Sequence, residues 1–90
     1  MDNQTDTQTS KPRVLLLDKD LQVAETIRGT LVSKGFDVEI AENQKQAVNL
    51  LTGFQQFDVL ITSGRMTEVE SLELLKMTRQ LKRDLPVMIF

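Results

Sequence analysis

The residues best suited to chemistry follow two separate apolar segments of the chain. One group is Asp18, Lys19 and Asp20 after residues 14–17, and the other is Thr62, Ser63 and Gly64 at the end of residues 57–62. Carboxylate oxygens are ligands that Mg²⁺ prefers, whereas a serine hydroxyl beside a lysine amine is one arrangement used for acyl transfer. The chemistry open to the chain therefore depends on whether the fold brings the two groups together.

Alternating strand and helix patterns predict the elements that position both groups. Strands are predicted at 13–17, 36–40, 57–62 and from Pro86 onward. The first helix begins after Asp20 and ends near Gly35, the second begins after Asn43, and the third spans 72–81 after a loop at 63–70. The predicted apolar helix faces are Leu21, Ala24, Ile27 and Leu31; Ala47, Leu50, Leu51 and Phe54; and Leu72, Leu75 and Thr78 (or Leu74, Leu75 and Met77) with Leu81.

The order of these elements predicts an α/β fold with a doubly wound parallel sheet. The first and third strands are apolar throughout, as expected of strands buried on both faces, whereas 36–40 alternates and indicates a sheet edge. This pattern fits the strand order 2-1-3-4, in which the first and third strands are neighbours. Ligands bind such sheets at the carboxyl ends of the strands near the switch in strand order. The two polar groups are therefore expected to form one site.

Composition excludes several classes of function. The chain contains no Cys and no His, so a disulfide framework, a zinc site built on thiolates or imidazoles, and a Ser-His-Asp triad are impossible. The net charge of −2 gives no electrostatic reason to expect nucleic acid or an anionic membrane surface. The cations at 76, 79, 82 and 83 are interpreted as a solvated helix face that complements the C-terminal end of the helix dipole.

The amino-terminal residues differ in character from the rest of the chain. Residues 1–11 are polar and lack the apolar region of a secretory signal, so they are predicted to be a disordered tail before one domain at 12–90. The longest apolar runs are too short to cross a membrane. A cytoplasmic protein without a membrane partner is expected.

Several segments together carry a resemblance to a known family. Residues 14–20, residues 57–67, Leu72-Glu73-Leu74-Leu75 and Leu85-Pro86-Val87-Met88-Ile89 resemble, in order and spacing, the bacterial response-regulator receiver domain. The resemblance covers residues 13–90 and implies a flavodoxin-like fold and a role in two-component phosphorelay signalling. It also implies a protein module that is not an enzyme.

The departures from this family bear directly on function. The resemblance implies a phosphate-accepting Asp where this chain has Ser63, and a second metal-binding acid where it has Lys19. A neutral hydroxyl needs a base to attack a phosphoryl group, and an ammonium has no lone pair for a metal. Of the motif in the following loop, only Met66 is retained. A pseudo-receiver is therefore predicted, with no cofactor, no metal beyond a residual acidic pocket of Asp18 and Asp20, and Thr62, Gly64 and Met66 lining the site.

The predicted function is regulation through protein binding. The expected partners are a sensor kinase, an output domain, or a second copy joined through the fourth strand. Because the sequence stops inside an apolar strand, the domain is expected to be truncated after that strand, and an assembly-dependent fragment of a longer response regulator is one alternative. A Ser63–Lys19 hydrolase or transferase is the other, and Lys19 paired with Asp18 or Asp20 is the simpler expectation for that site.

Overall fold

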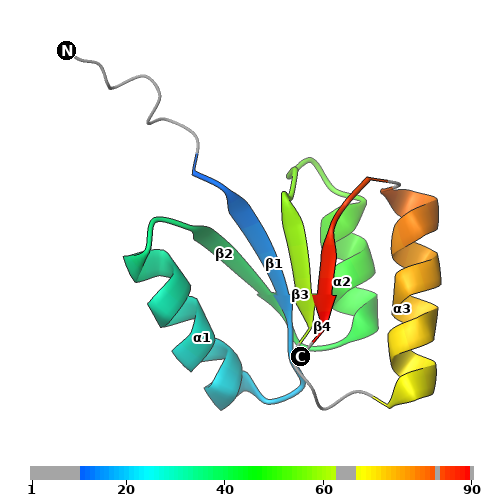
Figure 1. Cartoon of the computed structure of the whole chain (residues 1–90), viewed down its shortest axis with the longest axis horizontal. Helices are drawn as coiled ribbons and strands as arrows, with labels where there is room; N and C mark the ends of the chain where they lie inside the picture. Colours follow the sequence, from blue (N-terminus) through cyan, green and yellow to red (C-terminus); the bar gives the residue numbers. More distant parts are fainter. Residues whose placement is uncertain (1–10, 63–66, 83, 90) are drawn as a thin grey trace.

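The computed structural model describes residues 11–62, 67–82 and 84–89, apart from the side chain of Glu68. The elements, in chain order, are β1 (Arg13–Leu17), α1 (Leu21–Ser33), β2 (Asp37–Ala41), α2 (Gln44–Leu51), β3 (Val59–Thr62), α3 (Glu68–Leu81) and β4 (Val87–Ile89). Figure 1 shows them as a strand layer between helices.

The strands form one parallel sheet in the order β2-β1-β3-β4, which confirms the predicted doubly wound topology. Leu17 at the end of β1 lies beside Ala41 of β2 and Thr62 of β3. The carboxyl ends of these three strands are therefore level, and residues that follow them meet at one edge of the sheet. β2 is an edge strand, as its alternating pattern predicted.

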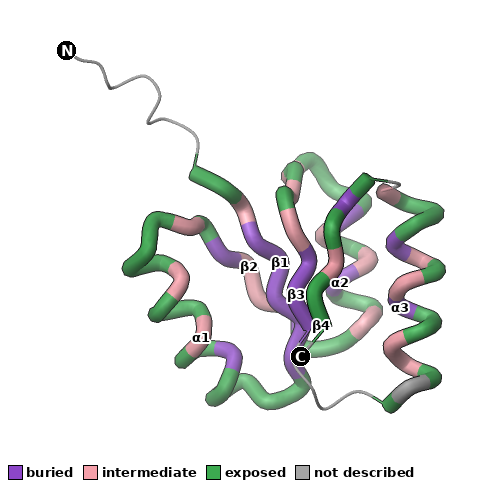
Figure 2. The backbone as a smooth tube through the Cα atoms, in the orientation of Figure 1, coloured by how far each residue is buried: buried purple, intermediate pink, exposed green. Residues whose placement is uncertain are grey.

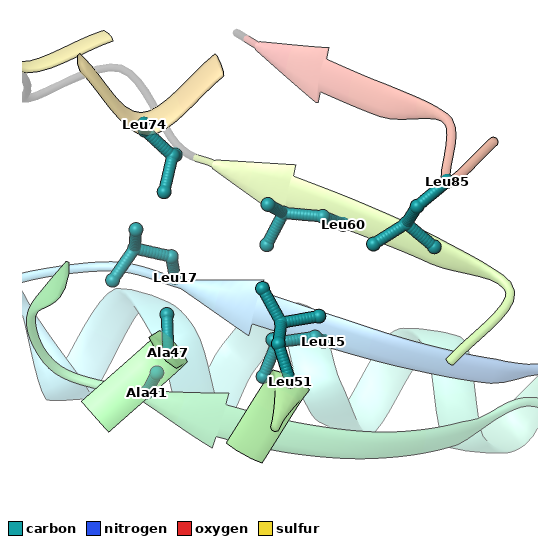
Figure 3. Close-up of a cluster of buried hydrophobic side chains, with 8 residues drawn as sticks. All are labelled: Leu15, Leu17, Ala41, Ala47, Leu51, Leu60, Leu74 and Leu85. Carbon is teal, nitrogen blue, oxygen red and sulfur yellow. The ribbon is translucent and has the colours of Figure 1, made fainter. Parts of the chain in front are cut away.

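Helices cover both faces of the sheet (Figure 1), with α1 on one face and α2 and α3 on the other. Alternate residues of β1 point to opposite faces, so they belong to two cores. The first core contains Leu15, Leu17, Ala41, Ala47, Leu51, Leu60, Leu74 and Leu85 (Figure 3). The second contains Val14, Leu16, Ala24, Val38 and Ile61. Figure 2 shows that burial is concentrated in β1 and β3, which therefore provide a rigid base for the residues at their ends.

Local sequence signals fix the helix ends near the site. The Asp20 carboxylate accepts hydrogen bonds from the backbone N–H groups of Gln22 and Val23, at 3.0 and 3.3 Å, so it caps α1 as predicted. Asn43 caps α2 through the N–H of Gln46 at 2.9 Å. After α1 the chain turns at Gly35, whose φ of 95° favours glycine.

Some predicted boundaries and faces were wrong. β2 begins and ends one residue later than predicted, and β3 begins at Val59 rather than residue 57. Because α2 ends at Leu51, Phe54 lies beyond the helix and is fully exposed instead of packing in the core. α3 begins at Glu68, within the predicted loop, and buries Leu74 and Thr78, while Leu72 is exposed.

On α1, Ala24 is buried and Ile27 and Leu31 pack against the second core, whereas Leu21 is exposed. Within the described ranges, no helix is both long enough and apolar enough to cross a bilayer.

Candidate functional site

The candidate site lies at the carboxyl ends of β1 and β3. Leu17 and Thr62 are register partners, so Asp18 begins the loop after β1 directly beside the end of β3. Ser63, Gly64 and Met66, which the sequence places in the same site, fall outside the described residues. The predicted proximity of Ser63 to Lys19 therefore stays a prediction.

Asp18 is buried, with 2% of its surface exposed. Its backbone N–H donates to the Ala41 carbonyl at 3.0 Å, and its Oδ1 accepts from the Asp20 N–H at 2.9 Å. Its Oδ2 and the Thr62 hydroxyl are buried, and neither has a hydrogen-bond partner among the residues that the structure describes. Asp18 is therefore buried, because the loop turns back over its carboxylate, whereas Asp20 is exposed.

Lys19 contacts a residue from a distant part of the chain. Its ammonium Nζ lies 3.1 Å from both carboxylate oxygens of Glu70, in the first turn of α3. The expected pairing of Lys19 with Asp18 or Asp20 was therefore wrong. The cause is geometric, because Asp18 is buried under the loop and Asp20 caps α1, so neither carboxylate meets the Lys19 side chain.

Glu70 also closes the amino-terminal end of α3. Its Oε1 accepts from the Thr67 N–H at 3.0 Å, and its own N–H donates to the Thr67 hydroxyl at 3.1 Å, which completes a capping box. The hydrogen bond from the Thr67 backbone and then the Lys19 ammonium lower the pKa of Glu70 below its usual 4.5. One carboxylate thus joins the loop after β1 to the start of α3.

Sequence reasoning overlooked Glu70 as a site residue. The signal that could have found it is the spacing of Thr67 and Glu70, since a Thr followed three residues later by a Glu is the pattern of a capping box. That pattern would have placed the start of α3 correctly. Nothing in the local sequence indicated that Lys19 would reach the same carboxylate.

A pocket of about 260 Å³ opens beside these residues. Its walls are Leu17, Asp18, Lys19, Asn43, Gln44, Lys45 and Glu70, from the carboxyl end of β1 and the amino-terminal ends of α2 and α3. Lys19 and Lys45 offset the charges of Asp18 and Glu70 in its lining. The pocket therefore has no concentration of negative charge.

The described residues do not fit a magnesium site well. No three acidic side chains among residues 11–62, 67–82 and 84–89 lie close enough together to hold a metal ion. Asp18 offers one free oxygen, and Glu70 is engaged by Lys19 and by the Thr67 backbone. Mg²⁺ requires six hard oxygen ligands in near-ideal octahedral geometry, and an ammonium beside them repels the cation.

The same contact bears on the alternative of a Ser63–Lys19 enzyme. The Lys19 ammonium is engaged by both Glu70 oxygens, so it is not free to take a proton from a neighbouring hydroxyl. No observation in the described part of the chain favours this alternative.

Comparison with known proteins agrees with the topology. The family model described as the response regulator receiver domain matches residues 14–90. The response regulator MprA of Mycolicibacterium vanbaalenii is 29% identical over 77 residues, which are 86% of this chain and 33% of the relative. This chain therefore spans about a third of the length of that relative.

Two solved structures show the same arrangement. The non-phosphorylated receiver domain of HemR from Leptospira biflexa is 29% identical, with a TM-score of 0.75 over 88% of this chain and 63% of that one. The response regulator TrrA of Thermotoga maritima, solved in complex with the histidine kinase ThkA, is 23% identical, with a TM-score of 0.74 over 87% of this chain and 66% of that one. The second likeness shows the fold alone. With the family model matching from β1 to β4 and the strand order in agreement, this chain belongs to the response regulator receiver domain family of two-component systems.

Proposed function

We propose that this receiver domain does not accept phosphate and acts as a protein-interaction module held in one state. The observation that carries the proposal is the contact of Lys19 with Glu70, which fixes a protein-borne cation at the strand ends. Ser63, at the position where the family has its phosphate-accepting Asp, supports the same conclusion from the sequence. The domain has no enzymatic activity of its own.

The proposed inability to accept phosphate follows from the charges of the side chains at the strand ends. A phosphate-accepting carboxylate is already anionic at neutral pH, whereas the Ser63 hydroxyl is neutral and the chain has no His to activate it. A divalent ion would have to bind near an ammonium and share the single free oxygen of Asp18. The Lys19 ammonium therefore replaces, in part, the positive charge that a metal would bring.

Binding of another protein is the function that remains to such a domain. A sensor kinase is the partner suggested by the TrrA–ThkA complex, and an output domain or a second copy of the chain are further candidates. Among the described residues β4 is the outer strand of the sheet next to β3, and its Met88 and Ile89 are 49% and 44% exposed, so this surface is a candidate for such contacts.

A magnesium titration tests the proposal. Isothermal calorimetry is expected to show no saturable Mg²⁺ binding to the wild-type chain, whereas Lys19→Asp combined with Ser63→Asp gains it, because the double variant adds two carboxylates at the strand ends. The matched control is Lys76→Asp with Ser63→Asp, which changes charge equally at an exposed position outside the pocket and leaves Lys19 in place. Saturable Mg²⁺ binding by the wild-type chain would contradict the proposal.

A further inference from the structure

The first two turns of α3, with their cap, span residues 67–73 and are held differently from the rest of that helix. None of their described side chains is buried, and Val69 and Leu72 are 65% and 58% exposed. Burial begins at Leu74, which lies in the first core (Figure 3), and Figure 2 shows this change along the helix. Apolar packing therefore holds α3 on the sheet from Leu74 onward and contributes little before it.

Polar contacts show the same division. Near the carboxyl end of α3, Arg79 donates to the Leu85 carbonyl at 2.8 Å and ties the helix to the segment before β4. Within the described part of the chain, a single hydrogen-bonded ion pair joins the first two turns to another element, and it is the contact of Lys19 with Glu70. The position of these turns against the loop after β1 therefore depends on one contact between charges.

This contact can be lost without loss of the helix. Both side chains are partly exposed, so water and dissolved ions screen their attraction. The capping box does not involve Lys19, because Glu70 and Thr67 satisfy each other's backbone N–H groups. Two positions of the first turns that differ by one screened ion pair are close in free energy, so ionic strength shifts their populations.

We propose that the Lys19–Glu70 contact is a latch that responds to ionic strength. When it is closed, it holds the first two turns of α3 against the loop after β1. When it is open, these turns move away while the helix from Leu74 onward stays on the sheet. Because Lys19 and Glu70 both line the pocket beside Asp18, opening removes part of the wall of that pocket.

The latch deepens the proposed function and rests on it, because the closed latch is the contact that holds the domain in one state. Its test measures distances within the protein, whereas the proposed function is tested by binding of Mg²⁺ and transfer of phosphate. Phosphorylation of the chain would therefore contradict the proposed function, and it would leave the measured response of the latch to salt as it is.

Distances between spin labels test the latch. The chain has no Cys, so two Cys residues introduced at exposed positions carry the labels. Gln22→Cys on α1 is combined either with Val69→Cys in the first turn of α3 or with Gln80→Cys near its other end. Pulsed electron paramagnetic resonance at low salt is expected to give one distance population for each pair. Lys19→Met is expected to broaden the distribution of the Val69 pair about twofold and to leave that of the Gln80 pair unchanged.

Salt and further variants show whether charge is responsible. Raising the ionic strength to about 1 M, where the Debye length is about 3 Å, is expected to broaden the wild-type distribution of the Val69 pair and to leave that of Lys19→Met unchanged. Glu70→Gln keeps an acceptor for the backbone N–H of the cap and is expected to broaden the distribution in the same way. Arg28→Met removes an exposed ion pair within α1 and is the matched control, with no change expected.

Three results would overturn the proposal. The first is an unchanged distribution of the Val69 pair in Lys19→Met, which would show that other contacts hold the first turns. The second is an equal change of the Gln80 pair, which would show that the whole helix moves. The third is a wild-type distribution that does not respond to salt, which would show that the attraction between the charges does not hold the two elements together.

Discussion

The Lys19 ammonium holds positive charge at the strand ends and also joins the loop after β1 to the start of α3. It contacts both oxygens of Glu70, and Glu70 in turn accepts the Thr67 N–H. The pair is partly exposed, with 51% of the Lys19 side chain and 37% of the Glu70 side chain accessible. Solvent therefore screens the contact, and its main consequence is to fix geometry and charge at the strand ends.

The lowered pKa of Glu70 predicts a pH-dependent contribution to stability. Folding favours the ionised carboxylate, so this contribution is complete above the usual pKa of 4.5 and is lost as the pH falls through the lowered value. Denaturant unfolding of the wild type and of Glu70→Gln is expected to differ at neutral pH and to converge in acid. Glu73→Gln is the matched control on the same helix. A constant difference down to acid pH would contradict the assignment.

The buried carboxylate of Asp18 leads us to expect that its substitution by Asn raises the free energy of unfolding. Its buried Oδ2 has no hydrogen-bond partner within the described ranges, so part of the cost of burying the carboxylate is uncompensated there. Asp18→Asn keeps an acceptor for the Asp20 N–H and removes the charge, and it is expected to raise the free energy of unfolding by about 1 kcal/mol. Urea unfolding measures this change, and a loss of stability of similar size would show that Asp18 is compensated in the folded protein.

The sequence predicted the positions of the site residues better than their contacts. The positions of Asp18, Lys19 and Thr62 could be predicted because these residues lie at strand ends, and the register of a parallel sheet fixes where each strand stops. The contact of Lys19 with Glu70 depends on how the loop after β1 meets the start of α3, 51 residues further along the chain. No local pattern carries that information.

At the scale of elements, the start of α3 determines the candidate site because it positions Glu70. Thr67 and Glu70 satisfy each other's backbone N–H groups, and Arg79 donates to the Leu85 carbonyl at 2.8 Å beyond the other end of the helix. Side chains thus bond to backbone at both ends of α3. The amino-terminal end of α3 also carries Glu70, the residue that Lys19 contacts.

Loss of the capping box is expected to affect both the helix and the site. Thr67→Ala removes the acceptor for the Glu70 N–H and should lower the free energy of unfolding by about 1 kcal/mol. Thr30→Ala on α1 is the control, because the Thr30 hydroxyl bonds only within the helix and its loss should change little. Chemical unfolding compares the two, and equal effects would show that the cap does not stabilise α3.

The fold was predictable from the sequence because most of its signals were periodic apolar patterns or capping residues at helix ends. Apolar strands, the caps Asp20 and Asn43 and the alternation at 36–40 gave the order and the edge of the sheet correctly. Phe54 was misplaced because a helical pattern can continue past the last helical turn, and here Thr52 and Gly53 already bond back to α2. Leu72 was misplaced because two helical faces fitted the apolar residues of α3, and only packing on the sheet selects between them.

At the scale of the whole molecule, the two ends of the sheet carry different sets of residues. The carboxyl end carries the candidate site with its fixed cation, while the amino end carries Phe54 and a groove between the ends of α2 and α3. The two ends are separated by the length of β1 and β3, whose residues are mostly buried, as Figure 2 shows. Substitutions at one end are therefore expected to leave the other unchanged.

The most direct test of the central claim is phosphorylation itself. The wild-type chain is incubated with acetyl phosphate and Mg²⁺, and its intact mass is measured before and after the incubation. The account predicts an unchanged mass for this chain, since a neutral hydroxyl at position 63 and an ammonium at position 19 replace the two carboxylates expected there. An increase by the mass of one phosphoryl group would contradict it.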